Sequence, residues 1–140
     1  MIIVSACLLG ENCKYSGGNN RNNEVIDFLK NKSYRSVCPE VDGGLQCPRP
    51  PAEICGDRVI DKEGNDVTNA FLLGAEKVLN LAVSVNAELC ILKANSPSCG
   101  CGMVYDGSFS GKKVPGNGIT ADLLIKNNFH VISEKDLKND

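Results

Sequence analysis

The stretch of sequence that most limits the fold covers residues 89–102. It begins with Leu89-Cys-Ile-Leu-Lys93, a short apolar segment with the length of one buried strand. The following residues, Ala-Asn-Ser-Pro-Ser-Cys-Gly-Cys-Gly, cannot continue a strand, because Pro97 lacks a backbone donor and the glycines permit positive φ. We therefore expect a buried strand that enters a tight loop. This loop presents four side chains that can carry chemistry: Ser96, Ser98, Cys99 and Cys101.

The rest of the chain alternates between apolar, strand-like segments and segments with helical periodicity. Strands are expected at residues 2–6, 34–37, 89–93 and 129–132. Helices are expected at about 24–30, 68–85 and 119–126, with a short one from residue 134. This alternation predicts an α/β fold, with a parallel sheet of about four strands in the order 2-1-3-4 and helices on both faces. The proline- and glycine-rich residues 41–66 are expected to form a long ordered cover loop with a short strand at 58–61.

Length and composition narrow the class of protein. A chain of 140 residues predicts one domain over 1–140, and a net charge of −2 with 5% aromatic residues argues against nucleic acid as a partner. The N-terminus does not have the pattern of a signal peptide, and no apolar run reaches the roughly 18 residues that cross a bilayer. We therefore expect a cytoplasmic protein without a membrane partner. In that reducing compartment the eight cysteines are expected to act as metal ligands or reactive thiols rather than disulfides.

Three of these cysteines follow three of the expected strands. Cys7, Cys38 and Cys99 would converge at the carboxyl edge of a parallel sheet, where ligands bind in such folds. Thiolates there could hold zinc with Cys13, Cys47 or Cys101 as a fourth ligand, although the cysteine spacing matches zinc ribbons poorly. They could instead hold an iron–sulfur cluster that leaves one iron open. A thiol redox protein that uses Cys99/Cys101 or Cys7/Cys13 is a third interpretation.

Several motifs, spread over nearly the whole chain, resemble the thiouracil desulfidase family of small bacterial iron–sulfur proteins. They are Ser5-Ala-Cys-Leu-Leu-Gly10, Cys38-Pro-Glu-Val-Asp-Gly-Gly-Leu45, Pro48-Arg-Pro-Pro-Ala-Glu-Ile54, Asp66-Val-Thr68, Ser96-Pro-Ser-Cys-Gly100, Tyr105-Asp-Gly-Ser-Phe-Ser-Gly111 and Gly116-Asn-Gly-Ile-Thr-Ala121. The resemblance implies a Rossmann-like fold and a [4Fe-4S] cluster on Cys7, Cys38 and Cys99, with one iron not ligated by protein. Such an open cluster is expected to be oxygen-sensitive and to be lost from an aerobically grown crystal. The implied activity is non-redox, hydrolytic removal of sulfur, as sulfide, from a thiolated pyrimidine base, nucleoside or nucleotide.

The resemblance also implies that Glu40 and Ser98 are catalytic. We expect Glu40 to move protons, and an extended backbone after Cys38 would point both side chains to the same side. Arg49 could bind an anionic group of the substrate, or it could pair with Glu53 or another surface carboxylate. Ser96 is a further candidate for substrate contact, and the amides of Gly116 and Gly118, at a helix start, could hold an anion. A small-molecule partner is expected, with the protein a monomer or weak oligomer.

Overall fold

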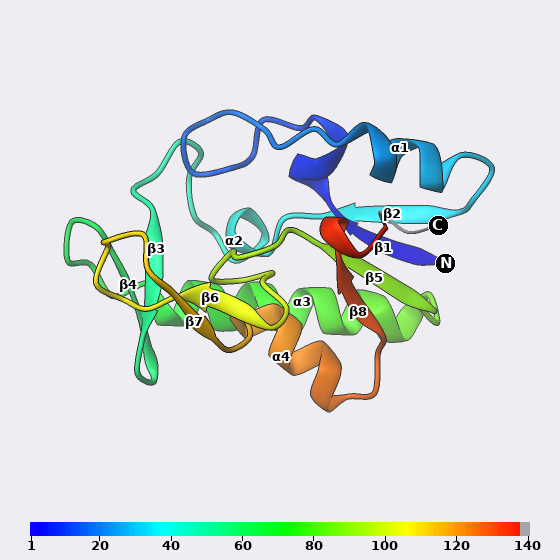
Figure 1. Ribbon diagram of the computed structural model, residues 1–140. Coiled ribbons are helices and arrows are strands. Elements are labelled where there is room, and N and C mark those ends of the chain that lie inside the picture. Colours follow the sequence, from blue (N-terminus) through cyan, green and yellow to red (C-terminus); the bar gives the residue numbers. More distant parts are fainter. Residues whose placement is uncertain (138–140) are drawn as a thin grey trace.

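Four parallel strands form the central sheet, in the spatial order β2-β1-β5-β8 (Figure 1). The structure is a computed structural model that describes residues 1–137. The strands of the sheet are β1 (Ile2–Ser5), β2 (Tyr34–Val37), β5 (Leu89–Leu92) and β8 (Val131–Ser133). Both the predicted α/β class and the predicted strand order are confirmed. The fourth strand begins two residues later than expected, and residues 138–140 of the expected domain lie outside the described residues.

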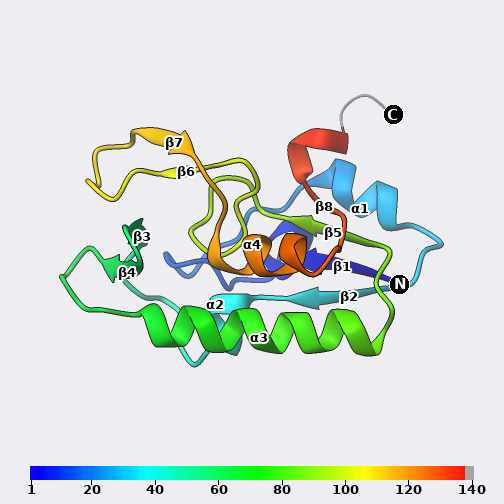
Figure 2. The same ribbon diagram turned by 90° about the horizontal axis from the view of Figure 1, so that it is seen from below.

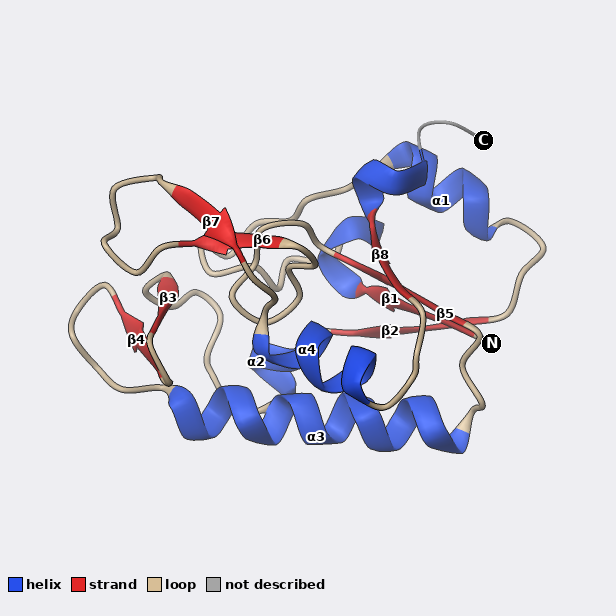
Figure 3. Ribbon diagram, turned by 60° about the horizontal axis from the view of Figure 1, so that its bottom comes forward, coloured by secondary structure: helices blue, strands red, loops and turns tan. Residues whose placement is uncertain are grey.

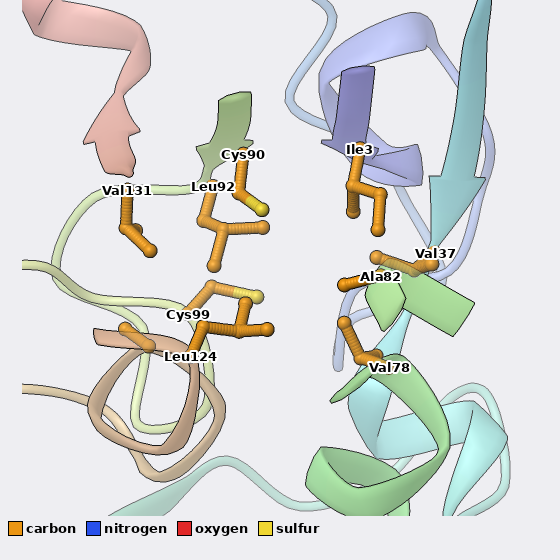
Figure 4. Packing of buried hydrophobic residues seen from close by; sticks show 10 residues of the cluster. Ile3, Val37, Val78, Ala82, Cys90, Leu92, Cys99, Leu124 and Val131 are labelled. Carbon is orange, nitrogen blue, oxygen red and sulfur yellow. The ribbon is translucent and has the colours of Figure 1, made fainter. Parts of the chain in front are cut away.

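Helical segments cover both faces of the sheet. They are α1 (Asn23–Leu29), α2 (Pro39–Asp42), α3 (Thr68–Ser84) and α4 (Ile119–Lys126), with short 3-10 helices η1 (Ala6–Leu9) and η2 (Glu134–Leu137). Side chains alternate between the two faces of a strand, so Ile3 packs with α3 and α4, whereas Ile2 and Val4 pack with α1, η1 and η2. Figure 4 shows the first of these clusters, in which Val78 and Leu124 meet the sheet. No helix within residues 1–137 is long and apolar enough to cross a membrane.

Two antiparallel hairpins extend beyond the carboxyl ends of the strands (Figures 2 and 3). The first pairs β3 (Ala52–Cys55) with β4 (Arg58–Asp61), and the second pairs β6 (Met103–Tyr105) with β7 (Lys113–Pro115). The cover region is thus ordered, and the short strand expected at 58–61 is present. Sequence reasoning did not identify its partner β3, because residues 52–55 alternate only weakly between apolar and polar.

The short helix α2 packs directly on α3 through two glycines. A Cβ at Gly43 would overlap the carbonyl of Ala70, and a Cβ at Gly74 would overlap the carbonyl of Pro39. The two backbones can approach this closely only because neither residue has a side chain. Since α2 follows Cys38 and contains Glu40, this contact also sets where these two residues lie.

The substitution Gly74→Ala tests this contact. Alanine in an exposed helix interior stabilises by about 1 kcal/mol relative to glycine, but overpacking typically costs about 1–3 kcal/mol. Because the obstructing atom belongs to a backbone carbonyl, we expect the cost of the overlap to exceed the gain in helix propensity. The melting temperature should therefore fall. Thermal unfolding followed by circular dichroism measures this. Gly18→Ala is the matched control, since a Cβ there meets only side-chain atoms, at 3.5 Å or more. A more stable Gly74→Ala variant would contradict this description of the contact.

Candidate active site

Three adjacent strands deliver three cysteines to one cavity. Cys7 lies in η1 directly after β1, Cys38 is the N-cap residue of α2 after β2, and Cys99 lies in the loop after β5. β1 pairs in parallel with both β2 and β5, so the three carboxyl ends lie at one edge of the sheet. All three cysteines line a cavity of about 500 Å³ at this edge. Residues of both hairpins form the opposite wall, among them Glu53, Tyr105 and Phe109.

The loop that carries Cys99 is held by Ser96. The Oγ atom of Ser96 accepts hydrogen bonds from the amides of Ser98 (3.2 Å) and Cys99 (3.1 Å). The start of α4 then docks on this loop, with the amide of Thr120 2.8 Å from the Ser98 carbonyl. A Cβ at Gly118 would lie 2.6 Å from that same carbonyl oxygen, so only glycine permits this approach. Ser96 and the start of α4 therefore position Cys99.

The backbone amides of the two glycines that were proposed to hold an anion already donate hydrogen bonds within the protein. The amide of Gly116 donates to the carbonyl of Gly102 at 3.0 Å, and the amide of Gly118 donates to the carbonyl of Gly100 at 2.7 Å. Neither residue lines the cavity. An anion at these amides would first have to displace backbone hydrogen bonds, so the arrangement supports a role in holding the Cys99 loop.

Each of the three cysteine sulfurs has a polar neighbour. Asn20 Nδ2 donates to Cys7 Sγ at 3.5 Å, and Ser5 Oγ donates to Cys99 Sγ at 3.4 Å. Burial raises the pKa of Cys99 to about 12, and the Ser5 and Ser98 hydroxyls oppose that rise. Burial also raises the pKa of Cys7, against the hydrogen bond from Asn20. Such donors stabilise charge on sulfur, which suits thiols that must become thiolates.

Cys38 differs because it lies against another cysteine. Its Sγ is 3.7 Å from the carbonyl oxygen of Cys13, and a hydrogen bond from the Cys13 thiol lowers the pKa of Cys38. The same contact raises the pKa of Cys13, which keeps its proton. Of the three cysteines considered as a fourth ligand, Cys13 is the one that lines the cavity.

The remaining cysteines are directed elsewhere. Cys47 Sγ lies 3.1 Å from the carbonyl oxygen of Asn12, and Cys101 Sγ lies 3.7 Å from that of Val131. Cys90 is fully buried within β5. All eight cysteines are free thiols, and none forms the disulfides that the sequence left open.

A largely buried carboxylate, that of Glu40, lies beside these thiols. Glu40 Oε1 is 3.0 Å from Arg49 Nη2 and accepts a hydrogen bond from Arg49 Nε at 3.1 Å, while Glu40 Oε2 accepts one from the Ser98 hydroxyl at 2.9 Å. The side chains of Glu40 and Arg49 are 14% and 8% exposed, so water screens this pair little. Ser98 Oγ also lies 3.7 Å from Cys99 Sγ. The Ser98 hydroxyl thus contacts both the Glu40 carboxylate and the sulfur of Cys99, one of the proposed cluster ligands.

The serines form an ordered chain of hydroxyls. With the single proton of the Ser98 hydroxyl on the shorter of its two contacts, to Glu40 at 2.9 Å rather than to Cys99 Sγ at 3.7 Å, the Ser96 hydroxyl donates across the 3.0 Å between the two Oγ atoms. Ser96 donates to Ser98, and Ser98 donates to Glu40. Both serines, which the sequence predicted at the site, line the cavity.

Two expectations about this region need correction. Residues 39–42 form the helix α2 rather than an extended segment, so Glu40 reaches the cavity because Cys38 caps a helix that starts at Pro39. Arg49 pairs with the buried Glu40 and not with Glu53. Its Nε, Nη1 and Nη2 atoms all donate to protein oxygens, including the carbonyls of Gln46 and Cys13 (both 3.1 Å).

Sequence reasoning did not single out several residues that surround the sulfurs. Ser5 and Asn20 donate to Cys99 and Cys7, and Lys93 lines the cavity while its Nζ pairs with Glu134 at 3.1 Å. Ser5 begins the first of the family motifs and is a polar residue at the end of an apolar strand, but neither signal indicated that its hydroxyl contacts Cys99. No local signal could show Asn20, because the loop that contains it returns to Cys7 only in the folded chain.

An α/β sheet whose carboxyl edge gathers thiols in one cavity has the donor set expected of a protein that binds an iron–sulfur cluster. A family model described as 2-thiouracil desulfurase matches residues 2–136, and the chain belongs to this family. The uncharacterized protein YbbK of Bacillus subtilis (strain 168) is 42% identical to this chain over 149 aligned residues. The alignment covers 99% of each of the two proteins. The [4Fe-4S]-dependent thiouracil desulfidase TudS has a similar structure, with a TM-score of 0.91, 42% identity, and coverage of 97% of this chain and 91% of TudS.

Proposed function

We propose that this chain is a [4Fe-4S]-dependent desulfidase that hydrolyses the C=S group of a thiolated pyrimidine and releases sulfide. Membership of the 2-thiouracil desulfurase family and the similarity to TudS support this proposal. The single observation that carries it is the contact of Glu40 with Ser98, at 2.9 Å, in the cavity that Cys7, Cys38 and Cys99 line. In this proposal, a proton-transfer group and a set of sulfur ligands share one cavity.

The residues of the cavity fit the cluster chemically. Thiolates are the usual protein ligands of iron–sulfur clusters, and the donors on Cys7 and Cys99 would stabilise their negative charge. Within residues 1–137, no three His, Cys, Asp or Glu side chains approach closely enough to hold a single metal ion. A four-iron cluster is wider than one ion, and we propose that Cys7, Cys38 and Cys99 hold it. When bound with one iron open, it would supply a soft Lewis acid for the thiocarbonyl sulfur.

The protein itself would handle the protons. Oε1 of Glu40 faces two nitrogens of Arg49, whereas Oε2 keeps a lone pair beyond its bond from Ser98, so the carboxylate can accept a proton from water at Oε2. The oxygen of that water forms a bond to the carbon, the C–S bond breaks, and both protons leave with the sulfur as H₂S. Electrons balance without an oxidant or reductant, since C=S and water give C=O and H₂S. Ser98, close to both Glu40 and Cys99, is placed to carry a proton toward the departing sulfur.

An anaerobic sulfide-release assay tests this function. The panel contains 2-thiouracil, 4-thiouracil, the thiouridines, their monophosphates and thiolated RNA, with the reconstituted protein and with the apoprotein. We expect sulfide and the oxygenated pyrimidine in equal amounts from at least one small substrate, and none without the cluster. Turnover of thiolated RNA alone would contradict the proposed small-molecule substrate. Absence of sulfide from all substrates, with a fully loaded cluster, would contradict the proposed function.

The zinc module and the thiol redox protein remain alternatives that metal analysis separates. Anaerobically purified protein should show broad absorption at about 400 nm and iron and sulfide in a ratio of about 4:4. Colourless protein with one tightly bound zinc per chain, and no reconstitutable iron, would favour the zinc module.

A further inference from the structure

Phe109 has a backbone conformation that is unusual for its residue type. Within residues 1–137, five residues other than glycine have positive φ, and four of them are asparagines, which tolerate the left-handed region. The fifth is Phe109, with φ of 58°. A bulky side chain in this region is strained, and such strain persists only where the surrounding structure holds it, which often happens at ligand-binding sites.

The β3–β4 hairpin holds Phe109 in this conformation. Glu53 Oε1 accepts hydrogen bonds from the amides of Gly107, at 2.9 Å, and Phe109, at 3.2 Å. Gly107 also lies so close to β3 that a Cβ would be 2.8 Å from the carbonyl oxygen of Ile54. Residues that are 54 and 56 positions from Glu53 are thus fixed by one carboxylate, which the mechanism proposed above does not use.

Phe109 lines the cavity that contains the cysteines and Glu40. Two other aromatic residues, Tyr15 and Tyr105, line it as well. A lysine ammonium lies over each tyrosine ring, with Lys14 5.7 Å from the centroid of Tyr15 and Lys113 5.9 Å from that of Tyr105. Within the described residues no such cation covers Phe109. Phe109 is partly exposed and is the one of the three rings that lines the cavity without such a cation.

We propose that Phe109 is the platform on which the planar ring of a heteroaromatic thiocarbonyl substrate stacks, and that Glu53 is the positioning residue that sets the platform. The inference deepens the proposed function and rests on it for the identity of the substrate. Stacking would orient the ring so that its thiocarbonyl group reaches the cysteine-lined end of the cavity. It selects for a flat conjugated ring, because an aromatic face gains little from a thiocarbonyl compound without one.

Steady-state kinetics with 2-thiouracil test the platform in the reconstituted enzyme. Phe109→Leu keeps an apolar side chain without the ring and should raise KM by about tenfold, the scale of one aromatic stacking contact. Turnover should change much less, and absorption of the cluster should stay at the wild-type level. Phe109→Tyr restores a ring and should keep KM within about threefold of wild type. Phe129→Leu, which alters a phenylalanine that packs on the core away from the cavity, is the matched control.

The strain supplies a second readout. Phe109→Gly removes the conformational penalty, so it should not melt at a lower temperature than Phe109→Leu, yet it should raise KM at least as much.

Glu53→Ala should raise KM as Phe109→Leu does. Glu53→Gln, whose carbonyl oxygen can still accept hydrogen bonds from both amides, should restore much of the affinity. KM values that stay at the wild-type level in Phe109→Leu and Phe109→Gly would overturn the proposal.

Binding of uracil, the expected product ring, separates this inference from the proposed function. Two-dimensional NMR titration of wild type should show uracil binding that Phe109→Leu weakens about tenfold and Phe109→Tyr retains. If the wild-type enzyme releases no sulfide but this pattern holds, the platform stands and the proposed reaction fails. If sulfide is released and both variants bind uracil as wild type does, the reaction stands and the platform is overturned.

Discussion

The substitution Cys99→Ser is expected to abolish cluster assembly, and with it all sulfide release. A serine hydroxyl is a hard donor with a very high pKa and is a poor substitute for a thiolate on iron. Absorption at about 400 nm after anaerobic reconstitution, with iron and sulfide content, measures the loss. Cys7→Ser and Cys38→Ser should behave in the same way.

Cys101→Ser is the matched control for this prediction. It lies two residues from Cys99 in the same loop, but its Sγ is directed to the carbonyl of Val131 and not to the cavity. It should assemble a full cluster. Cys13→Ser is more informative, since Cys13 contacts Cys38 at the site: a full cluster there means that three protein ligands suffice. If Cys99→Ser reconstitutes fully and Cys101→Ser does not, the assignment of ligands is wrong.

The substitution Glu40→Gln is expected to retain the cluster and to lose at least about 100-fold in turnover, the usual scale of general acid–base catalysis. Glutamine keeps the shape of the side chain but cannot take up the proton of the attacking water. Anaerobic sulfide release under saturating 2-thiouracil measures the loss. The melting temperature should fall as well, because Arg49, with 8% of its side chain exposed, would remain charged beside a neutral partner.

The double variant Glu40→Gln/Arg49→Met separates catalysis from stability. Replacing both members of a buried ion pair with neutral groups often restores stability, whereas removing one member alone typically costs about 3–5 kcal/mol. We expect the double variant to melt above the single variant and to remain as inactive. Recovery of turnover together with stability would show that the charge of Glu40 only balances Arg49. A normal rate in the single variant would likewise rule out a proton-transfer role.

The central sheet could be predicted from the sequence because its signals are local. The apolar runs of β1 and β5, together with the regular apolar face of α3 before β5, indicate parallel strands joined by helical crossovers. The carboxyl ends of such strands must meet at one edge, so the convergence of Cys7, Cys38 and Cys99 followed from the same pattern. The roles of the candidate residues came from the family resemblance and not from the pattern.

The contacts around the cysteines could not be predicted, because their partners are far apart in the chain. Arg49 is nine positions from Glu40 in the sequence, and Ser98 is 58 positions from it. The pairing of Arg49 with Glu53 was a reasonable alternative on charge alone. It fails because Glu53 instead accepts the amides of Gly107 and Phe109.

The sequence by itself determined the layered α/β fold, the order of its strands and the edge of the sheet where the cysteines gather, since periodicity and chain connectivity decide these. Only the tertiary structure decided which groups surround the sulfurs, that α2 turns Glu40 into the cavity, and that one hairpin holds Phe109 in a strained conformation over it. These features depend on close packing between distant segments, such as the approach of Gly74 to Pro39 and of Gly118 to Ser98. A local sequence pattern cannot encode a contact whose two halves are brought together only by folding.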